Sequence, residues 1–317
     1  MKSRDIKPLY QQIMHFMPPL IYVDIGARAM KRSRFVEAFP HAQYVGFELD
    51  AEECKRLNDL HIDRHHFYPL AIGCGRETKT LYLTRNPACS SFYEPNSQKM
   101  YRFVEFGPYF DVLEKKTVET VSLDDWYRNA GIPEAAFLEL DTQGSELDIL
   151  QGSEHLLSAS ILGLQIEVEF FPLYKDQPLF SDVDKYLRQL GFSLFDLSRY
   201  RLRRSYLKTR GQLLWGHAFY LKDVHEMKNG QLSQFLTLAA IASYYGFEDY
   251  ALEVLETVIK SEFHFKPLDN LEKIQGILDS YSESFFRPNQ RGIKRLWKEP
   301  FNWKVTPRKD RGYFIKD

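Results

Sequence analysis

The stretch LIYVDIGARAMKRSRFVEAFPHAQYVGFELD, residues 20–50, decides the fold class of this chain. It holds two compact apolar runs, LIYVDIG and QYVGFELD, and each stops at acidic residues or glycine, as a buried strand does where it meets a turn. Between the runs, Phe35, Val36 and Phe39 recur at helical spacing. A strand, a helix and a second strand in this order predict a parallel sheet with helices on its faces, because parallel neighbours need a crossover connection.

The alternation of strands and helices continues to about residue 224. Further strands are predicted at FYPLAIG (67–73), KTLYLT (79–84, an added antiparallel strand), VETVSL (118–123), FLEL (137–140) and ILGLQIEVEF (161–170). The last two runs, GFSLFDL (191–197) and LLWGHAFYLK (213–222), are close enough in sequence to form a hairpin. Together these runs predict an α/β domain of roughly seven strands whose final pair is antiparallel.

The composition changes at about residue 225. With the first predicted strand beginning at residue 20, the chain has three predicted parts. Residues 1–19 form a helical lead-in, 20–224 the α/β domain, and 225–317 a helical extension with a basic tail. The start of the extension is typical of two amphipathic helices joined at Gly246. Residues 225–286 hold ten acids against four Lys and Arg, and 287–317 hold ten Lys and Arg against three acids. The tail is therefore expected either to pack on the acidic helices or to contact an anionic partner.

The overall charge and the N-terminus exclude several classes of protein. With a formal net charge of −1, the chain is not expected to bind nucleic acid or membranes with its whole surface. The N-terminus lacks the apolar core of a signal peptide, and no run of about 18 apolar residues predicts a membrane span. Cys54, Cys74 and Cys89 are odd in number and show no CxxC spacing, as expected of reduced thiols in a cytoplasmic protein.

The predicted strand ends indicate a ligand that contains ribose, since ligands of open α/β sheets bind at the carboxyl ends of the strands. The first strand ends at Asp24 and Gly26, where a glycine lets the backbone approach a ligand. The second ends at Glu48, whose carboxylate can accept hydrogen bonds from both ribose hydroxyls. The fingerprint G-x-G-x-x-G is absent after Gly26, which makes a nicotinamide-dependent enzyme the less favoured alternative. S-adenosylmethionine, a ribose ligand without pyrophosphate, fits the pattern better.

Seven stretches, in this order, resemble the FkbM-type methyltransferases, in particular a branch that reads DVGARGG at its first turn. They are VDIGAR, YVGFELDAEEC, CSSFYEPN, VSLDDW, FLELDTQGSELDILQG, EVEFFPLYKDQPLF and GQLLWGHAFYL, and they cover roughly residues 20–222. The resemblance implies a Rossmann-like, seven-stranded methyltransferase sheet with an antiparallel last strand. It also implies S-adenosylmethionine as methyl donor, S-adenosylhomocysteine as product, and transfer to a hydroxyl of a sugar, a glycan or a hydroxylated natural product.

The resemblance and the strand ends together predict a set of cofactor contacts, which are Asp24, Gly26, Ala27, Arg28, Glu48, Leu49, Ala71, Ile72, Asp141 and Gln143. The chain departs from the pattern of this branch at three places. Ala29 and Met30 stand where glycines are usual, Leu49 replaces a proline, and His217 replaces an aspartate. A first turn changed enough to lose the cofactor would leave a catalytically inactive interaction protein, which is the alternative function.

The candidates for the catalytic base are acids near strand ends and a histidine within the last predicted strand. A hydroxyl acceptor must lose its proton as the new bond forms, and Asp141, Glu167, Glu169 and His217 are the groups that could take it. Asp141 directly follows the strand predicted at 137–140, beside the cleft where methyltransferases place residues that face donor and acceptor. The structural alternatives are a helix cap formed by Asp141 or Thr142 and a histidine that only packs in its strand.

Glu167 and Glu169 lie on one face of a predicted strand, because strand residues alternate. Two buried carboxylates without a cation are costly, so we expect them to face solvent, pair with arginine, or bind a metal or acceptor hydroxyls. The acids are compatible with a divalent metal such as magnesium, although their spacing does not require one. Ser90 and Ser91 are expected in a loop over the cleft, or hydrogen-bonded within that loop.

A basic and aromatic segment, RYRLRRSYLKTRG at residues 199–211, precedes the last predicted strand. It carries Arg199, Arg201, Arg203, Arg204, Lys208 and Arg210 together with Tyr200 and Tyr206. Such a segment can clamp an anionic acceptor, for example a phosphorylated or nucleotide-linked glycan, with tyrosines against the sugar rings. The alternative is a solvated hairpin whose charges keep an edge strand from aggregating. Nucleic acid is a less expected partner because the chain is nearly neutral overall.

Overall fold

The computed structural model describes residues 7–28, 33–104, 106–132, 135–227, 230–260 and 272–279. Contacts within the chain divide it into two compact units, one formed by residues 17–230 and the other by 1–16 together with 231–317. The altered first turn at Ala29 and Met30 and the basic tail at 287–317 lie outside the described residues.

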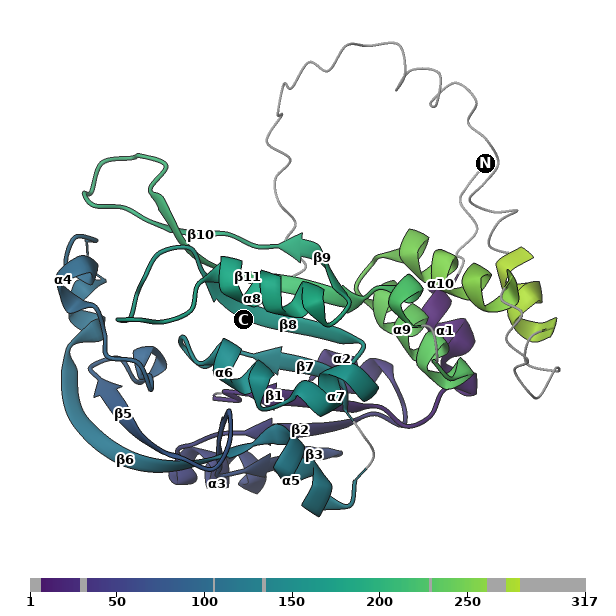
Figure 1. Ribbon diagram of the computed structural model, residues 1–317, viewed down its shortest axis with the longest axis horizontal. Helices are drawn as coiled ribbons and strands as arrows, with labels where there is room; N and C mark the ends of the chain where they lie inside the picture. The colour runs from purple at the N-terminus through teal and green to yellow at the C-terminus, as the bar shows by residue number, and fades with distance from the viewer. Residues whose placement is uncertain are drawn as a thin grey trace, which may run out of the picture. The chain divides into compact units, whose positions relative to one another are not determined.

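The larger unit is built on one mostly parallel sheet (Figure 1). Its central strands β8, β7, β1, β2 and β3 lie side by side in this order and are all parallel, as the strand and helix alternation predicts. β11 pairs antiparallel with β8, and both β9 and β10 pair antiparallel with β11. The predicted α/β class with an antiparallel last pair is therefore confirmed. The strands are β1 Ile21–Ile25, β2 Gln43–Phe47, β3 His65–Tyr68, β7 Ala135–Leu140, β8 Gly163–Glu169, β9 Phe192–Leu197, β10 Tyr200–Leu202 and β11 Gln212–Lys222.

Helices cover the apolar face of this sheet. Side chains that alternate toward that face, such as Val23, Leu138 and Ile166, are fully buried and share one core with residues of α5, α6, α7 and α8. α3 and α5 begin after Asp50 and Ser122, whose side chains accept backbone N–H bonds of the first turn. The helices are α2 Arg34–Ala38, α3 Ala51–Asp59, α5 Leu123–Ala130, α6 Glu146–Gln151, α7 Glu154–Ala159 and α8 Phe180–Gln189.

The third predicted strand, residues 67–73, is wrong as a single strand. β3 ends at Tyr68, before Pro69, which has no N–H to donate to a sheet. β4 (Ala71–Gly73) then leaves the main sheet and pairs with β6 (Val112–Ser122). The chain thus bends at the proline and starts a second, three-stranded sheet.

This second sheet is completed by β5 (Thr78–Thr84), which pairs antiparallel with β6 as predicted for residues 79–84. The strand predicted at 118–123 is only the C-terminal part of β6. Residues 112–117 are exposed and lack an apolar period, so their pairing with β5 could not be read from periodicity.

Shorter helices complete the larger unit, namely η2 Pro87–Cys89, α4 Ser97–Met100, η3 Gly107–Phe110 and η4 Val224–Glu226. The three cysteines are free thiols; Cys54 and Cys89 are buried and Cys74 is exposed. In the part of the chain that the structure describes, none of the helices has both the length and the apolarity needed to cross a bilayer.

The smaller unit is helical. α9 (Leu232–Tyr244) and α10 (Glu248–Lys260) are joined at Gly246, which has a φ of +88°, so the predicted pair of helices is confirmed. The N-terminal helix α1 (Leu9–Ile13), followed by η1 (Met14–Phe16), packs against α9. The Tyr10 backbone N–H donates to Ser243 Oγ at 3.0 Å. The predicted lead-in is therefore part of the helical unit, a pairing across more than 200 residues that no local pattern could indicate.

Candidate active site

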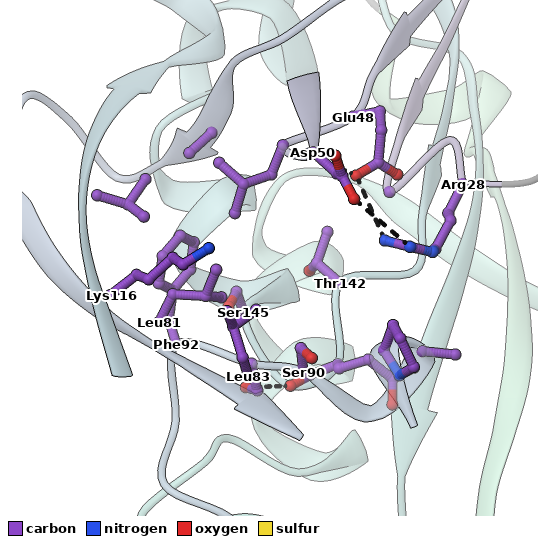
Figure 2. A pocket seen from close by; sticks show the side chains of 18 of the residues that line it. Arg28, Glu48, Asp50, Leu81, Leu83, Ser90, Phe92, Lys116, Thr142 and Ser145 are labelled. Atoms are coloured by element: carbon purple, nitrogen blue, oxygen red, sulfur yellow. Dashed lines mark hydrogen bonds and ion pairs between the residues drawn. The ribbon is translucent and has the colours of Figure 1, made fainter. Parts of the chain in front are cut away.

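A cavity of about 1000 Å³ lies at the carboxyl ends of β1, β2 and β7 (Figure 2). Most of the predicted cofactor contacts line it, namely Gly26, Arg28, Glu48, Leu49, Ala71, Ile72, Asp141 and Gln143. Asp24 and Ala27 are buried and are not among the lining residues. The second sheet adds a largely apolar wall with Leu81, Leu83 and Val118. The cavity thus combines polar strand ends with an apolar side, as small-molecule sites do.

Glu48 is the buried acid at the polar end of this cavity. Its Oε1 accepts the Asp50 backbone N–H at 2.8 Å and lies 3.9 Å from the Arg28 guanidinium, which is also 3.6 Å from Asp50. Figure 2 shows these three side chains together on one side of the cavity, with Leu81, Phe92 and Lys116 on the other. Burial raises the pKa of Glu48, against the opposing effects of the Asp50 N–H and of Arg28. The carboxylate keeps further lone pairs for a ligand.

The turn after β7 is held by a residue that the sequence analysis did not single out. Glu146 is 2% exposed, and its Oε1 accepts the Thr142 N–H at 2.8 Å and the Thr142 hydroxyl at 3.0 Å, while Oε2 accepts the Gly144 N–H at 2.9 Å. Burial raises the pKa of Glu146 to about 7, Asp141 adds to the rise, and the hydrogen bonds oppose it. The sequence does carry a sign of this role: Glu146 comes just after a glycine turn, at the start of a helix, where acids are favoured.

This arrangement contradicts the structural alternative for Asp141. α6 begins after Ser145, and Asp141 accepts a side-chain hydrogen bond from Gln143 instead of capping the helix. Gln143 and Gly144 form the predicted turn with φ values of +59° and +103°. A left-handed conformation costs a non-glycine residue about 1 to 2 kcal/mol, so the contacts of Gln143 must hold it there.

Gln143 connects both walls of the site. Its Nε2 donates to Asp141 Oδ1 at 2.9 Å and to Glu167 Oε2 in a short hydrogen bond. Its Oε1 lies 3.0 Å from the hydroxyl of the fully buried Tyr174, and its backbone carbonyl accepts the Ser91 hydroxyl at 2.6 Å. Ser91 therefore ties the predicted cleft loop to the turn at Gln143. Ser90 accepts the Thr84 N–H at 3.1 Å, and both serines line the cavity.

Three candidate bases meet in one row across adjacent strands. Glu167 on β8 lies directly opposite His217 on β11, and Asp141 follows β7, the other neighbour of β8. One ligand atom from each of the three side chains lies within 4.8 Å of the others. Only Asp141 lines the cavity; Glu167 is 7% exposed and His217 half-buried. The strand register thus brings together residues 76 positions apart in the sequence.

Burial dominates the pKa shifts of the two glutamates and the histidine in and next to this row. Burial is the main cause that raises the pKa of Glu167, and the charges of Asp141 and Glu169 raise it further. Burial likewise raises the pKa of Glu169, which is 2% exposed on the same face of β8. Burial lowers the pKa of His217, against a smaller opposite effect of Asp141. Neither glutamate faces solvent, which removes one of the three expectations for this pair.

A second polar row lies deeper on the same sheet face. Asp24 and Glu139 are register partners on β1 and β7; the Tyr44 hydroxyl donates to Asp24 and the Tyr22 hydroxyl to Glu139. Gln165 also donates to Glu139 at 2.9 Å. Burial raises the pKa of both acids, and the tyrosine hydrogen bonds partly offset the rise. Asp24 thus belongs to a buried network beneath the cavity wall.

Comparison with known proteins decides the family. The family described as Methyltransferase FkbM domain matches residues 24–194, more than half of the chain. This chain belongs to the FkbM methyltransferase family. A curated relative, 2-O-methyltransferase NoeI of Sinorhizobium fredii, is 26% identical over 187 residues, which cover 54% of this chain and 71% of the relative.

Two solved structures similar to this FkbM-family chain are methyltransferases. A methyltransferase FkbM from Methylobacillus flagellatus KT has a TM-score of 0.38 and 13% identity, and the match covers 64% of this chain and 43% of that one. The magnesium protoporphyrin IX methyltransferase of Synechocystis PCC 6803, solved with bound SAM, has a TM-score of 0.34 and 10% identity, covering 68% and 78%.

The basic segment of this FkbM-family chain lies next to the row of candidate bases. Tyr200 on β10 stacks on Trp215 with ring centroids 5.4 Å apart and meets His217 edge-on at 5.6 Å. The Arg204 guanidinium lies over Phe103 at 5.0 Å, and the Val104 N–H donates to the Arg203 carbonyl. The segment is thus anchored at its base, while Tyr206 near its tip is 76% exposed.

Proposed function

We propose that this FkbM-family chain is an S-adenosylmethionine-dependent O-methyltransferase whose acceptor is a hydroxyl of a sugar or glycan. The observation that carries the proposal is Glu48, a buried carboxylate at the end of β2 that faces a cavity large enough for a nucleoside ligand. Family membership supports methyl transfer, and the similarity to the 2-O-methyltransferase NoeI supports transfer to oxygen.

The residues around the cavity fit the proposed cofactor. Glu48 would accept the ribose hydroxyls, and Leu49 and Ile72 offer apolar contact for the adenine ring. A Cβ at Gly26 would meet the Asp141 carbonyl oxygen at 2.1 Å, so only glycine allows the β1 and β7 turns to approach each other here. When bound, S-adenosylmethionine supplies an electrophilic methyl group on a positively charged sulfur.

The protein would contribute positioning and a proton acceptor. Gln143 fixes Asp141 and Glu167 relative to each other, which keeps the reacting groups in a productive orientation. We propose that the cluster of Asp141, Glu167 and His217 receives the proton of the acceptor hydroxyl, with the exposed Asp141 at its cavity side.

A sugar acceptor is favoured by the aromatic surface beside this cluster. Tyr200 is 39% exposed and its ring lies parallel to that of Trp215, next to His217. Exposed aromatic faces of this kind pack against the apolar faces of sugar rings. The arginines of segment 199–211 favour anionic sugars within this class.

Calorimetric titration with S-adenosylmethionine and S-adenosylhomocysteine tests the proposal against an inactive interaction protein. Glu48→Ala removes up to two hydrogen bonds to the ribose, so we expect a loss of about 2 to 4 kcal/mol in cofactor binding, or about 30-fold to several hundredfold in Kd. Glu119→Ala, an exposed acid on β6, is the matched control and should bind like the wild type. Absence of binding by the folded wild type at millimolar ligand would refute the enzyme and favour the interaction protein.

The acceptor class is tested by transfer of a labelled methyl group to a panel of neutral and anionic sugars and glycans. We expect label on a sugar hydroxyl. A second panel of the same size holds hydroxyl acceptors that are not carbohydrates. Label found only in that second panel would overturn the sugar proposal and leave the methyltransferase in place.

A further inference from the structure

We propose that Asp141, Glu167 and His217 form a binding site for one divalent metal ion. The ion site itself stands on geometry and charge, and its use in catalysis rests on the proposed O-methyl transfer. A divalent ion beside the cavity would bind the acceptor hydroxyl and lower its pKa, and the carboxylate oxygen of Asp141 that does not hold the ion would take the proton.

The backbone already places the three side chains for this task. Glu167 on β8 is the register partner of His217 on β11, and Asp141 is the first residue after β7, the other neighbour of β8. Ladder hydrogen bonds hold Glu167 and His217, and the Asp141 backbone N–H donates to the Ile25 carbonyl of β1 at 3.1 Å. Gln143 donates to both Asp141 and Glu167 with one nitrogen, which shows that the two carboxylates are close enough to share a single partner.

The distances are close to those of a coordinated ion. Carboxylate oxygens and imidazole nitrogens bind transition-metal ions at about 2.0 to 2.2 Å, so three ligands on one side of an ion are about 3 to 3.5 Å apart. Here the three ligand atoms lie within 4.8 Å of one another. Side-chain movements of up to about 1 Å would therefore bring all three within coordination distance of one ion.

Uncompensated charge provides a second, independent observation. Among the described residues, Asp141, Glu167 and Glu169 form no ion pair with Lys or Arg, although Glu167 and Glu169 are buried. Glu169 lies two residues from Glu167 on the same face of β8, and its Oε1 has no hydrogen-bond partner of normal geometry in the described part of the chain. Of the expectations for the buried glutamates, solvent exposure and arginine pairing are thus removed, and a metal ion or acceptor hydroxyls remain, both of which an ion site beside the cavity would provide.

The donor set narrows the class of ion. Two carboxylates and one imidazole suit first-row divalent ions such as Mn²⁺ better than Ca²⁺, which prefers oxygen alone. Three protein ligands leave coordination positions for water or for an acceptor hydroxyl. Tyr200, stacked on Trp215, meets His217 edge-on, so a sugar ring packed on this tyrosine would lie beside the ion site.

The test is Mn²⁺ uptake by tag-free, chelator-treated protein, followed as the loss of the free-ion electron paramagnetic resonance signal. The wild type should take up one ion per chain in a saturable manner. Glu167→Gln and His217→Gln should each raise the Kd at least about tenfold, as loss of a ligand or its support does. Glu154→Gln and His66→Gln, which change exposed residues of α7 and β3, are the matched controls and should bind like the wild type. Circular dichroism checks that every variant is folded.

The proposal is overturned if the wild type shows no saturable uptake at millimolar Mn²⁺, or if both site variants bind as the wild type does. A second outcome would also overturn it. In that outcome Mn²⁺ does not bind, S-adenosylmethionine binds more tightly than S-adenosylhomocysteine, and Glu167→Gln abolishes this preference. In that case the sulfonium is the cation that the acids serve. Titration with S-adenosylhomocysteine separates this test from the proposed function: site-dependent Mn²⁺ uptake without binding of that product supports the ion site and refutes only the methyltransferase.

Discussion

Replacement of Glu146 tests whether one buried carboxylate builds the turn at residues 141–144. The carboxylate accepts three hydrogen bonds, two from Thr142 and one from Gly144, at 2.8, 3.0 and 2.9 Å. In Glu146→Ala all three are lost. The Thr142 hydroxyl can rotate toward water, so the cost comes mainly from the two backbone N–H groups.

The magnitude follows from the burial of these two donors. Gly144 is buried, and an unsatisfied buried donor costs about 1 to 3 kcal/mol. Thr142 is half-buried, so water can replace part of its bond and the loss is about 1 kcal/mol. We therefore expect Glu146→Ala to lower the free energy of unfolding by about 2 to 4 kcal/mol, a large share of the stability of an ordinary domain.

Urea unfolding at about pH 5, where the folded-state carboxyl is protonated, measures this loss. Trp126 packs edge-on against Phe47 and Tyr68, with ring centroids 4.8 and 5.0 Å away, so its fluorescence reports unfolding of the larger unit. Glu146→Gln keeps the acceptor for Thr142 and should lose only about 1 to 3 kcal/mol. Glu154→Ala, an exposed acid at the start of the next helix, is the control. If Glu146→Ala were no less stable than Glu154→Ala, the backbone would hold the turn unaided and the reasoning would be refuted.

Three further predictions concern pH, the reacting acid and the basic segment. The pKa of Glu146 is raised to about 7 from 4.5, so its contribution is fully present below about pH 4.5 and is lost as the pH rises through 7. The stability difference between wild type and Glu146→Gln should thus shrink by up to about 3 kcal/mol over that window in urea unfolding; a difference independent of pH would contradict the raised pKa. Asp141→Asn should fold like the wild type, because an amide oxygen can still accept the Gln143 bond, but methyl transfer should fall at least about tenfold; unchanged turnover would make Asp141 structural. Reversal of charge at Arg203 and Arg204 should reduce transfer to anionic sugars about tenfold and spare neutral ones, since the change in Coulomb attraction acts only on charged acceptors; equal loss for both kinds would leave a solvated hairpin.

The fold class could be predicted because its determinants are local. Apolar runs that end in acids at residues 20–26 and 43–50, with a helical period between them, specify a parallel βαβ unit wherever it occurs. The same locality explains the success with the antiparallel hairpin of β9 and β11 and with the helix pair at Gly246. Prediction failed where a pairing had no period of its own, as in residues 112–117 of β6, or where Pro69 divided one apolar run between two sheets.

The sequence by itself determined which acids stand at or near strand ends, so that Glu48, Asp141 and Glu167 were candidates, together with His217 inside the last strand. Only the tertiary structure decided which of them meet. The register of β7, β8 and β11 brings Asp141, Glu167 and His217 within 4.8 Å, and Glu146 turns back to hold the loop before its own helix. The physical reason is that alternation and helical period depend on neighbours along the chain, whereas strand register and burial depend on which distant segments pack together.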